Sequence, residues 1–213
     1  IVTGIEKANT DRTVHGIIVM LPLWKGIDEK TILRSISPEK DIDGVNPVNV
    51  GKLVLGDKSS FHPSTAEACV EILKAYGHDP AGKHVVIIGR SNIVGKPLAN
   101  ILVQKGVDAT VTVCHSRTRG LADICRKADI LVAAIGSPRF VTRDFTHHDQ
   151  IIVDVGMNEV EDGKGGYGLA GDVDFENVKD HVKAITPVPG GVSPFTHTSL
   201  IKNILKAIEL QNL

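Results

Sequence analysis

A glycine-containing turn between an apolar strand and a helix is the part of this 213-residue sequence best suited to chemistry. The turn reads Gly89-Arg-Ser-Asn-Ile-Val-Gly95 and follows the apolar run 83–88. Glycine permits a tight turn and close backbone approach, and the first N–H groups of the following helix attract a phosphate. The turn lacks the G-x-G-x-x-G spacing of common dinucleotide sites, so an ordinary strand-to-helix connection is the alternative interpretation.

The end of the next apolar run, 109–114, indicates which dinucleotide the turn would bind. NAD enzymes usually place an acidic residue there for the ribose 2′-hydroxyl. This chain continues instead as His115-Ser-Arg-Thr118, without an acid. Hydroxyl and cationic side chains suit a 2′-phosphate, so Arg90, Ser91 and Ser116 favour NADP. Arg117 is either a further contact or a solvated surface charge.

Alternating strands and helices are expected to position these residues. The predicted strands are 83–88, 109–114, 129–134 and 150–154, and the helices between them are 97–106 and 121–127. This alternation predicts an α/β fold with a Rossmann-like parallel sheet.

The segments before and after this core also have predicted structures. The apolar run 16–23 predicts another buried parallel strand, and 28–36 predicts an amphipathic helix. A capping box at 64–67 opens a further helix. The stretch 39–63 is expected to be irregular, and the last helix is expected over 199–210, capped by Thr196 or Thr198.

Composition excludes several classes of protein. A net charge of -1 does not indicate a nucleic-acid partner, and no apolar run is long enough to span a membrane. The adjacent His147 and His148 have no accompanying ligand spacing, so no metal site is expected. Three cysteines without a C-x-x-C motif indicate a reducing, cytoplasmic compartment. Because the chain begins at Ile1, we expect it to be part of a longer natural protein.

Eight segments, taken in order, resemble the methylenetetrahydrofolate dehydrogenase/methenyltetrahydrofolate cyclohydrolase family. The resemblance extends over nearly the whole chain, and the ordered set is more specific than any single segment. The segments are 16–23, 40–44, 49–51, 89–97, 110–116, 154–156, 171–173 and 185–192.

The resemblance implies two domains with folate held in the cleft between them. Residues 1–66 would form an incomplete N-terminal α/β domain on which the final helix, 196–211, packs, and 67–195 would form the NADP-binding domain. The implied enzyme is a homodimer of one-carbon metabolism that supplies purine biosynthesis. It oxidises 5,10-methylenetetrahydrofolate with NADP, and many family members then hydrolyse the methenyl product to 10-formyltetrahydrofolate.

The resemblance also assigns residues to the site. Asp43 is implied to bind the pterin edge and to serve catalysis, and Gly44 to keep its loop close to the ring. The implied substrate contacts also include Val19, Met20, Leu21, Pro189, Gly190, Gly191 and Val192, with a possible cis proline among them. The implied cofactor contacts are Gly89, Arg90, Ser91, Gly95, Ser116 and Met157.

Two departures from the family pattern concern hydrolysis. No Tyr-x-x-x-Lys motif, whose lysine is catalytic in the family, occurs in this sequence, because Pro80 and Gly171 lie four residues after the only tyrosines, Tyr76 and Tyr167. We expect the motif to lie in the N-terminal part of the natural protein, before Ile1. Met20 occupies a slot that is usually glutamine, and a thioether is a poor hydrogen-bonding group. Two alternative functions remain open: a degenerate relative that binds NADP without folate turnover, and a different Rossmann oxidoreductase.

Overall fold

The computed structural model describes residues 1–161 and 165–211. The chain divides into two units. Thr65–Thr196 is called the sheet unit below, and Ile1–Ser64 with His197–Leu213 is called the helical unit.

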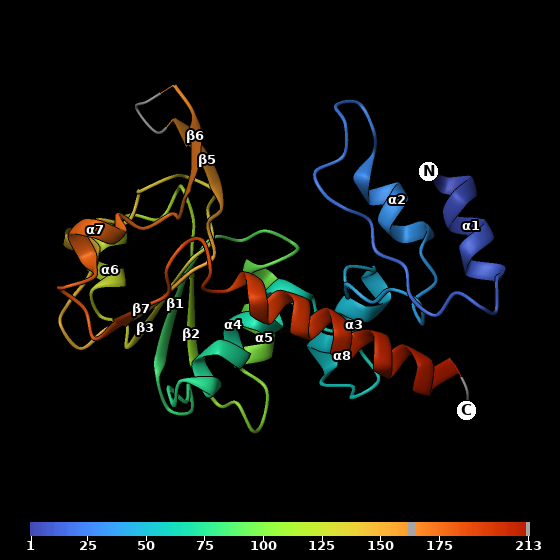
Figure 1. Cartoon of the computed structure of the whole chain (residues 1–213). Helices are drawn as coiled ribbons and strands as arrows, with labels where there is room; N and C mark the ends of the chain where they lie inside the picture. The colour runs from blue at the N-terminus through green and yellow to red at the C-terminus, as the bar shows by residue number, and fades with distance from the viewer. Residues whose placement is uncertain (162–164, 212–213) are drawn as a thin grey trace. The chain divides into compact units, whose positions relative to one another are not determined.

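A five-stranded parallel sheet forms the centre of the sheet unit (Figure 1). Its strands lie in the order β2-β1-β3-β4-β7, and all neighbours pair in parallel. The strands are β1 (His84–Ile88), β2 (Thr110–Cys114), β3 (Ile130–Ala133), β4 (Ile151–Asp154) and β7 (Ala184–Ile185). The predicted parallel α/β fold is therefore confirmed, although β7 was not anticipated.

The sheet is covered on both faces, which explains its continuous apolar strands. Alternate residues such as Val86, Leu131 and Ile152 pack in one buried cluster with Cys125 and Val178. These contacts place α6 (Leu121–Cys125) and α7 (Phe175–Val178) on one face, while α4 (Ser64–Ala75) and α5 (Gly95–Leu102) lie on the other (Figure 1).

The remaining elements of the sheet unit are short. A 3-10 helix, η1 (Arg143–Phe145), lies between β3 and β4. An antiparallel pair, β5 (Asn158–Glu161) with β6 (Tyr167–Ala170), follows β4 and was also not anticipated. The cysteines Cys69, Cys114 and Cys125 are all buried and free.

The helical unit contains α1 (Val2–Thr10), α2 (Glu29–Ser35) and α3 (Pro47–Leu55), together with most of α8 (Ser193–Gln211). Ile5, Ile32 and Ile36 join α1 to α2 in a small apolar core. The buried Lys40 ammonium closes the end of α1 by donating to the carbonyls of Ala8, Asn9 and Asp11 at 2.7–2.9 Å. Cationic groups stabilise the carboxyl end of a helix in this way.

Three sequence-based predictions for the helical unit are wrong. The run 16–23 is not a strand, because in the described structure it makes only one bridge, Ile17 to Asp41. The stretch 39–63 contains α3, whose start is capped by Asn46 and whose end is a left-handed Gly56. The last helix begins at Ser193, so neither Thr196 nor Thr198 caps it; a proline at its second residue is compatible with an earlier start.

Within residues 1–161 and 165–211, no helix is long and apolar enough to cross a bilayer. The same residues contain no cluster of three or more histidine, cysteine or acidic side chains that could hold a metal ion.

Candidate functional site

The turn after β1 is built so that only glycine fits at its two ends. Gly89 has a φ of 133°, and a Cβ there would lie 2.2 Å from the Ala134 carbonyl oxygen. A Cβ on Gly95 would lie 2.1 Å from the Gly89 carbonyl oxygen. The turn is therefore folded tightly against both the start of α5 and the end of β3. This is the close backbone approach that a phosphate-binding turn requires.

The Ser91 side chain stabilises the turn through hydrogen bonds to its backbone. Its hydroxyl accepts hydrogen bonds from the backbone N–H groups of Val94 at 3.0 Å and Gly95 at 3.4 Å. Arg90 and Ser91 are both exposed, so their side chains are accessible to an anion. A glycine-lined turn and the amino end of a helix therefore lie together, next to an exposed arginine.

The sheet order places this turn at a topological switch point. The chain leaves β1 towards β2 and then returns to β3 on the other side of β1. Ligands of open α/β sheets bind outside the carboxyl ends of the strands at such a point. Ser116, exposed just after β2, lies beyond the same edge, so the structure brings Gly89, Gly95 and Ser116 to one edge of the sheet.

A buried carboxylate fixes the loop after β4. Asp154, 2% exposed, accepts hydrogen bonds from the N–H groups of Gly156, Asp172 and Val173 at 2.9–3.0 Å. Burial raises the pKa of Asp154 to about 6, although these hydrogen bonds act in the opposite direction. A Cβ on Gly171 would lie 1.9 Å from the Asp154 carboxylate, so glycine is required beside it.

A second buried carboxylate, Asp172, fixes the loop after β3. It accepts hydrogen bonds from three consecutive N–H groups, those of Ile135, Gly136 and Ser137, at 2.7–3.0 Å. The Asn158 amide donates a fourth at 2.9 Å. Because Asp172 also donates its own N–H to Asp154, the two carboxylates join the loops after β3, β4 and β6.

Met157 and the segment 189–192, which were predicted to contact cofactor and substrate, lie together beyond β4 and β7. Met157, 56% exposed, borders the same small cavity of about 20 Å³ as Pro189, Gly190, Gly191 and Val192. The Val188–Pro189 bond is cis, as anticipated for this segment. Thr186 ties the segment to β4, because its hydroxyl accepts the Asp154 N–H at 2.8 Å.

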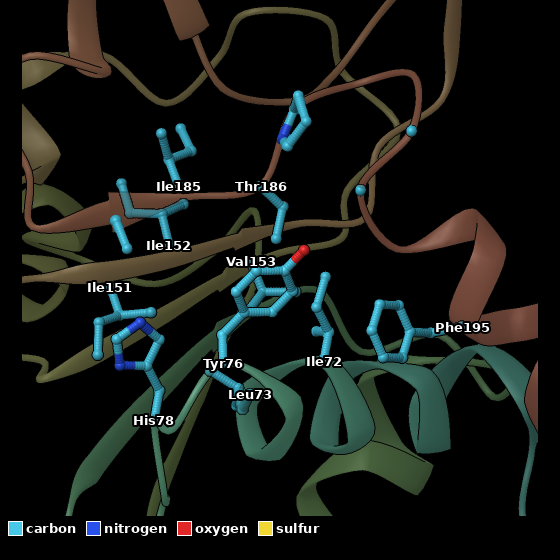
Figure 2. Close-up of a pocket in the computed structure, with 14 residues that line it drawn as sticks. Ile72, Leu73, Tyr76, His78, Ile151, Ile152, Val153, Ile185, Thr186 and Phe195 are labelled. Carbon is cyan, nitrogen blue, oxygen red and sulfur yellow. The ribbon is translucent and has the colours of Figure 1, made fainter.

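An apolar pocket of about 230 Å³ lies on the α4 side of β4 and β7 (Figure 2). In Figure 2, Tyr76 and Ile72 point towards Val153 and Thr186, and Phe195 closes one side. Gly190 and Gly191 are the only residues predicted to bind substrate or cofactor that line it. The pocket carries few polar groups, which makes it poorly suited to a charged nucleotide.

In the helical unit, Asp41 anchors the loop that carries Asp43. Its fully buried carboxylate accepts from the N–H groups of Val45 and Asn46 and from the Asn49 amide at 2.8–3.2 Å. Burial raises the pKa of Asp41, against these hydrogen bonds. The Asp41 carboxylate therefore stabilises the loop and is not exposed to solvent, whereas Asp43 is partly exposed.

Gly44 holds Asp43 close to a neighbouring segment. Gly44 has a φ of 68°, and a Cβ there would lie 2.5–2.7 Å from backbone atoms of Phe61, His62 and Pro63. Burial also raises the pKa of Asp43. A partly buried carboxylate fixed this way can accept two parallel hydrogen bonds from a planar heterocycle.

The segment 16–21 lies beside the Asp43 loop through the Ile17–Asp41 bridge. Val19 and Leu21 are partly buried, whereas Met20 is 76% exposed. The predicted substrate residues of the helical unit therefore occupy two neighbouring segments.

The roles of Asp154, Asp172 and Thr186 were not predicted from the sequence. The motifs 154–156 and 171–173 were noticed, but a short Asp-x-Gly or Gly-Asp pattern does not reveal that one carboxylate meets the backbone of the other. The nearest usable signal was the pairing of each aspartate with a glycine, since a buried acid needs close access to backbone N–H groups.

Replacing Gly95 by alanine tests the turn. Because the new Cβ would meet backbone, we expect Gly95→Ala to weaken NADP binding by about tenfold or more and to lower the melting temperature. Gly168→Ala is the matched control, since nothing lies within 4 Å of its added Cβ. Calorimetric titration and thermal unfolding measure both effects; equal affinities for the two variants would contradict the assignment of the turn.

Comparison with known families agrees with this geometry. The profile for the NAD(P)-binding domain of tetrahydrofolate dehydrogenase/cyclohydrolase matches residues 63–212. The profile for the catalytic domain of the same family matches residues 1–43.

Individual relatives cover almost the whole chain. It is 52% identical over 206 residues to the "Bifunctional protein FolD" of Chlamydia muridarum, covering 95% of this chain and 72% of that protein. The structure resembles the FolD methylenetetrahydrofolate dehydrogenase/cyclohydrolase of Campylobacter jejuni, with a TM-score of 0.91, 44% identity and coverage of 98% and 72%.

A third relative was solved with a ligand. The Trypanosoma brucei methylenetetrahydrofolate dehydrogenase-cyclohydrolase, complexed with NADP and an inhibitor, matches with a TM-score of 0.89 and 40% identity over 99% of this chain and 73% of that one. On these matches and on the glycine turn at the sheet edge, the chain belongs to the tetrahydrofolate dehydrogenase/cyclohydrolase family.

Proposed function

We propose that this chain oxidises 5,10-methylenetetrahydrofolate to 5,10-methenyltetrahydrofolate with NADP. The observation that carries the proposal is the Gly89–Gly95 turn at the switch point of a parallel sheet, in a chain of this family. The structure of the Trypanosoma brucei relative was solved with NADP bound, which supports the choice of cofactor. A degenerate binding protein and an unrelated oxidoreductase are not favoured, since the family match extends over both units.

The residues at the sheet edge fit NADP. The turn would hold the pyrophosphate, and the exposed Arg90, Ser91 and Ser116 would hold the 2′-phosphate. No acidic residue follows β2 within His115-Ser-Arg-Thr118 to hold an unphosphorylated ribose. Met157 and the segment 189–192 would flank the nicotinamide, and the bound cofactor supplies the acceptor for the hydride.

The protein's contribution to hydride transfer is placement. Aligning two rings at contact distance removes much of the entropic barrier. Met157 offers a partly exposed apolar surface, and Gly190 and Gly191 permit close approach to a flat ring. No side chain of this chain needs to exchange a proton for the hydride step itself.

Asp43 is proposed to orient the folate. Its carboxylate would accept two hydrogen bonds from the amino and ring N–H groups of the pterin, with Gly44 holding the loop in place. Val19, Met20 and Leu21 would supply apolar contacts next to this loop. Asp43 thus serves substrate binding, while Asp41 maintains the loop.

Hydrolysis of the methenyl product is proposed to be weakened by Met20, which provides a thioether where an amide is expected. The dehydrogenase step does not depend on this side chain.

The proposed enzyme consists of a folate-binding part, 1–66 with 196–211, and an NADP-binding part, 67–195. We also propose that it works as a homodimer in the cytoplasm. Three free, buried cysteines fit a reducing compartment. Exposed Phe140, Tyr167 and Leu169 on the sheet unit offer apolar surface for a second copy.

The dehydrogenase assignment is tested by leaving out either the folate substrate or NADP, and by one substitution. NADPH should form only when 5,10-methylenetetrahydrofolate and NADP are both present. Asp43→Ala should lower kcat/KM for the folate by about tenfold to a hundredfold, because hydrogen bonds to a charged group are lost. Asp57→Asn, an exposed change in the same unit, is the control. NADP binding without folate-dependent turnover would identify a degenerate relative instead.

The 2′-phosphate assignment predicts a change in cofactor preference. Arg90→Ala should weaken NADP binding by about tenfold or more while leaving NAD binding nearly unchanged, because only NADP carries the extra charge. The exposed Arg119→Ala serves as the control, and Arg117→Ala decides whether that residue is a contact or a solvated charge. Equal losses for both dinucleotides would remove Arg90 from the 2′-phosphate site.

The homodimer is tested by light scattering coupled to size exclusion. The expected mass is twice the 22.8 kDa of the chain. Charged substitutions of Tyr167 and Leu169 should shift the mass towards the monomer, because they place charge in an apolar contact. A monomer mass at micromolar concentration for the unaltered chain would contradict the dimer.

A further inference from the structure

The loop after β3 has three consecutive backbone N–H groups that converge on one anion. Successive N–H groups in a turn form a concave anion site, of the kind that often binds phosphate. Here the anion is the protein's own Asp172, which is fully buried and accepts from Ile135, Gly136 and Ser137. The loop is therefore shaped by an internal carboxylate, and its N–H groups are not available to a nucleotide.

The carboxylate also determines where the carbonyls of this loop point. In a trans peptide the N–H and the preceding C=O point in opposite directions. Cis bonds in the described chain occur only at Leu21–Pro22 and Val188–Pro189. The carbonyls of Ala134, Ile135 and Gly136 therefore point away from Asp172. The Ala134 carbonyl lies against Gly89, where an added Cβ would be 2.2 Å away.

The order of the strands gives this loop a place along the bound dinucleotide. Ser116 follows β2, the glycine turn follows β1, and Met157 follows β4. The loop after β3 lies between the turn and Met157, with about 4.8 Å between neighbouring strands. If the 2′-phosphate and the nicotinamide lie at the two ends, the group that passes the β3 loop is the ribose next to the nicotinamide.

We propose that Asp172 is a positioning residue that presents the carbonyls of Ile135 and Gly136 as acceptors to the nicotinamide-side ribose of NADP. This inference rests on the proposed function for the direction in which the cofactor lies. Ribose hydroxyls are hydrogen-bond donors, so a row of fixed carbonyls suits them. Asp172 itself touches no ligand and acts through the loop.

The interlock with Asp154 makes the arrangement rigid. Asp172 donates its N–H to the Asp154 carboxylate, and a Cβ on Gly156 would lie 2.4 Å from the Asp172 carboxyl carbon. Asn158 holds Asp172 from the β5 side at 2.9 Å. The loop is thus expected to have its binding conformation before any cofactor arrives.

Two ligands separate positioning from general stability. Adenosine 2′,5′-bisphosphate carries the adenosine half of NADP without the nicotinamide ribose. In Asp172→Asn an amide N–H would face backbone N–H groups, so the loop should turn away. We expect the Kd for NADP to rise by about tenfold or more, while the Kd for adenosine 2′,5′-bisphosphate changes by less than about twofold. Asp180→Asn, an exposed change in the same unit, should alter neither Kd.

Equal weakening of both ligands would reduce Asp172 to a structural residue, and unchanged NADP binding would overturn the proposal outright. If Asp172→Asn does not fold, hydrogen exchange of the unaltered chain decides. Amides 135–137 should be protected without cofactor, at a level close to that of β3. Fast exchange that slows only when NADP is added would contradict a preformed loop.

The binding and exchange measurements do not depend on folate turnover. An unaltered chain that binds NADP but forms no NADPH from methylenetetrahydrofolate would refute the proposed function, whereas the two Kd values of Asp172→Asn would still decide the role of Asp172. An unaltered chain that binds no NADP would refute both.

Discussion

A buried carboxylate must find hydrogen-bond donors, and at the carboxyl edge of this sheet the donors are backbone N–H groups of the loops. Asp154 takes up three of them and Asp172 takes up another three. Each acid lies so close to a glycine that no side chain would fit there: Asp154 lies beside Gly171, and Asp172 lies beside Gly156. The position of Met157, which directly follows Gly156, therefore depends on the hydrogen bonds of these two buried carboxylates.

The helical unit also contains a buried aspartate that accepts hydrogen bonds from the N–H groups of its own loop. The Asp41 carboxylate accepts hydrogen bonds from two backbone N–H groups and one side-chain amide, and Asp43, two residues later, is the residue proposed to bind the ligand. In both units a fully buried aspartate holds a loop whose neighbouring residues are proposed to bind ligand. Rigidity at the proposed site thus comes from buried acids that are already hydrogen-bonded within the protein, which reduces the ordering needed on binding.

The parallel sheet was predictable because buried strands such as Val85–Ile88 and 130–133 are continuous apolar runs separated by helical patterns. The run 16–23 has the same pattern but only one bridging partner among the described residues, so apolar character alone could not establish a strand. α3 was missed although Asn46, Pro47 and Gly56 mark its ends. The glycine turn was predicted from chemistry, whereas the Asp154–Asp172 contact joins residues 18 positions apart and needs the fold itself.

The most direct test of this account is a crystal structure of the chain with NADP bound. The 2′-phosphate should lie at Arg90 and Ser116, the pyrophosphate at the 89–95 turn, and the nicotinamide beside Met157 and Gly190. A nucleotide bound in the reverse direction, or in the apolar pocket beside Tyr76, would contradict it.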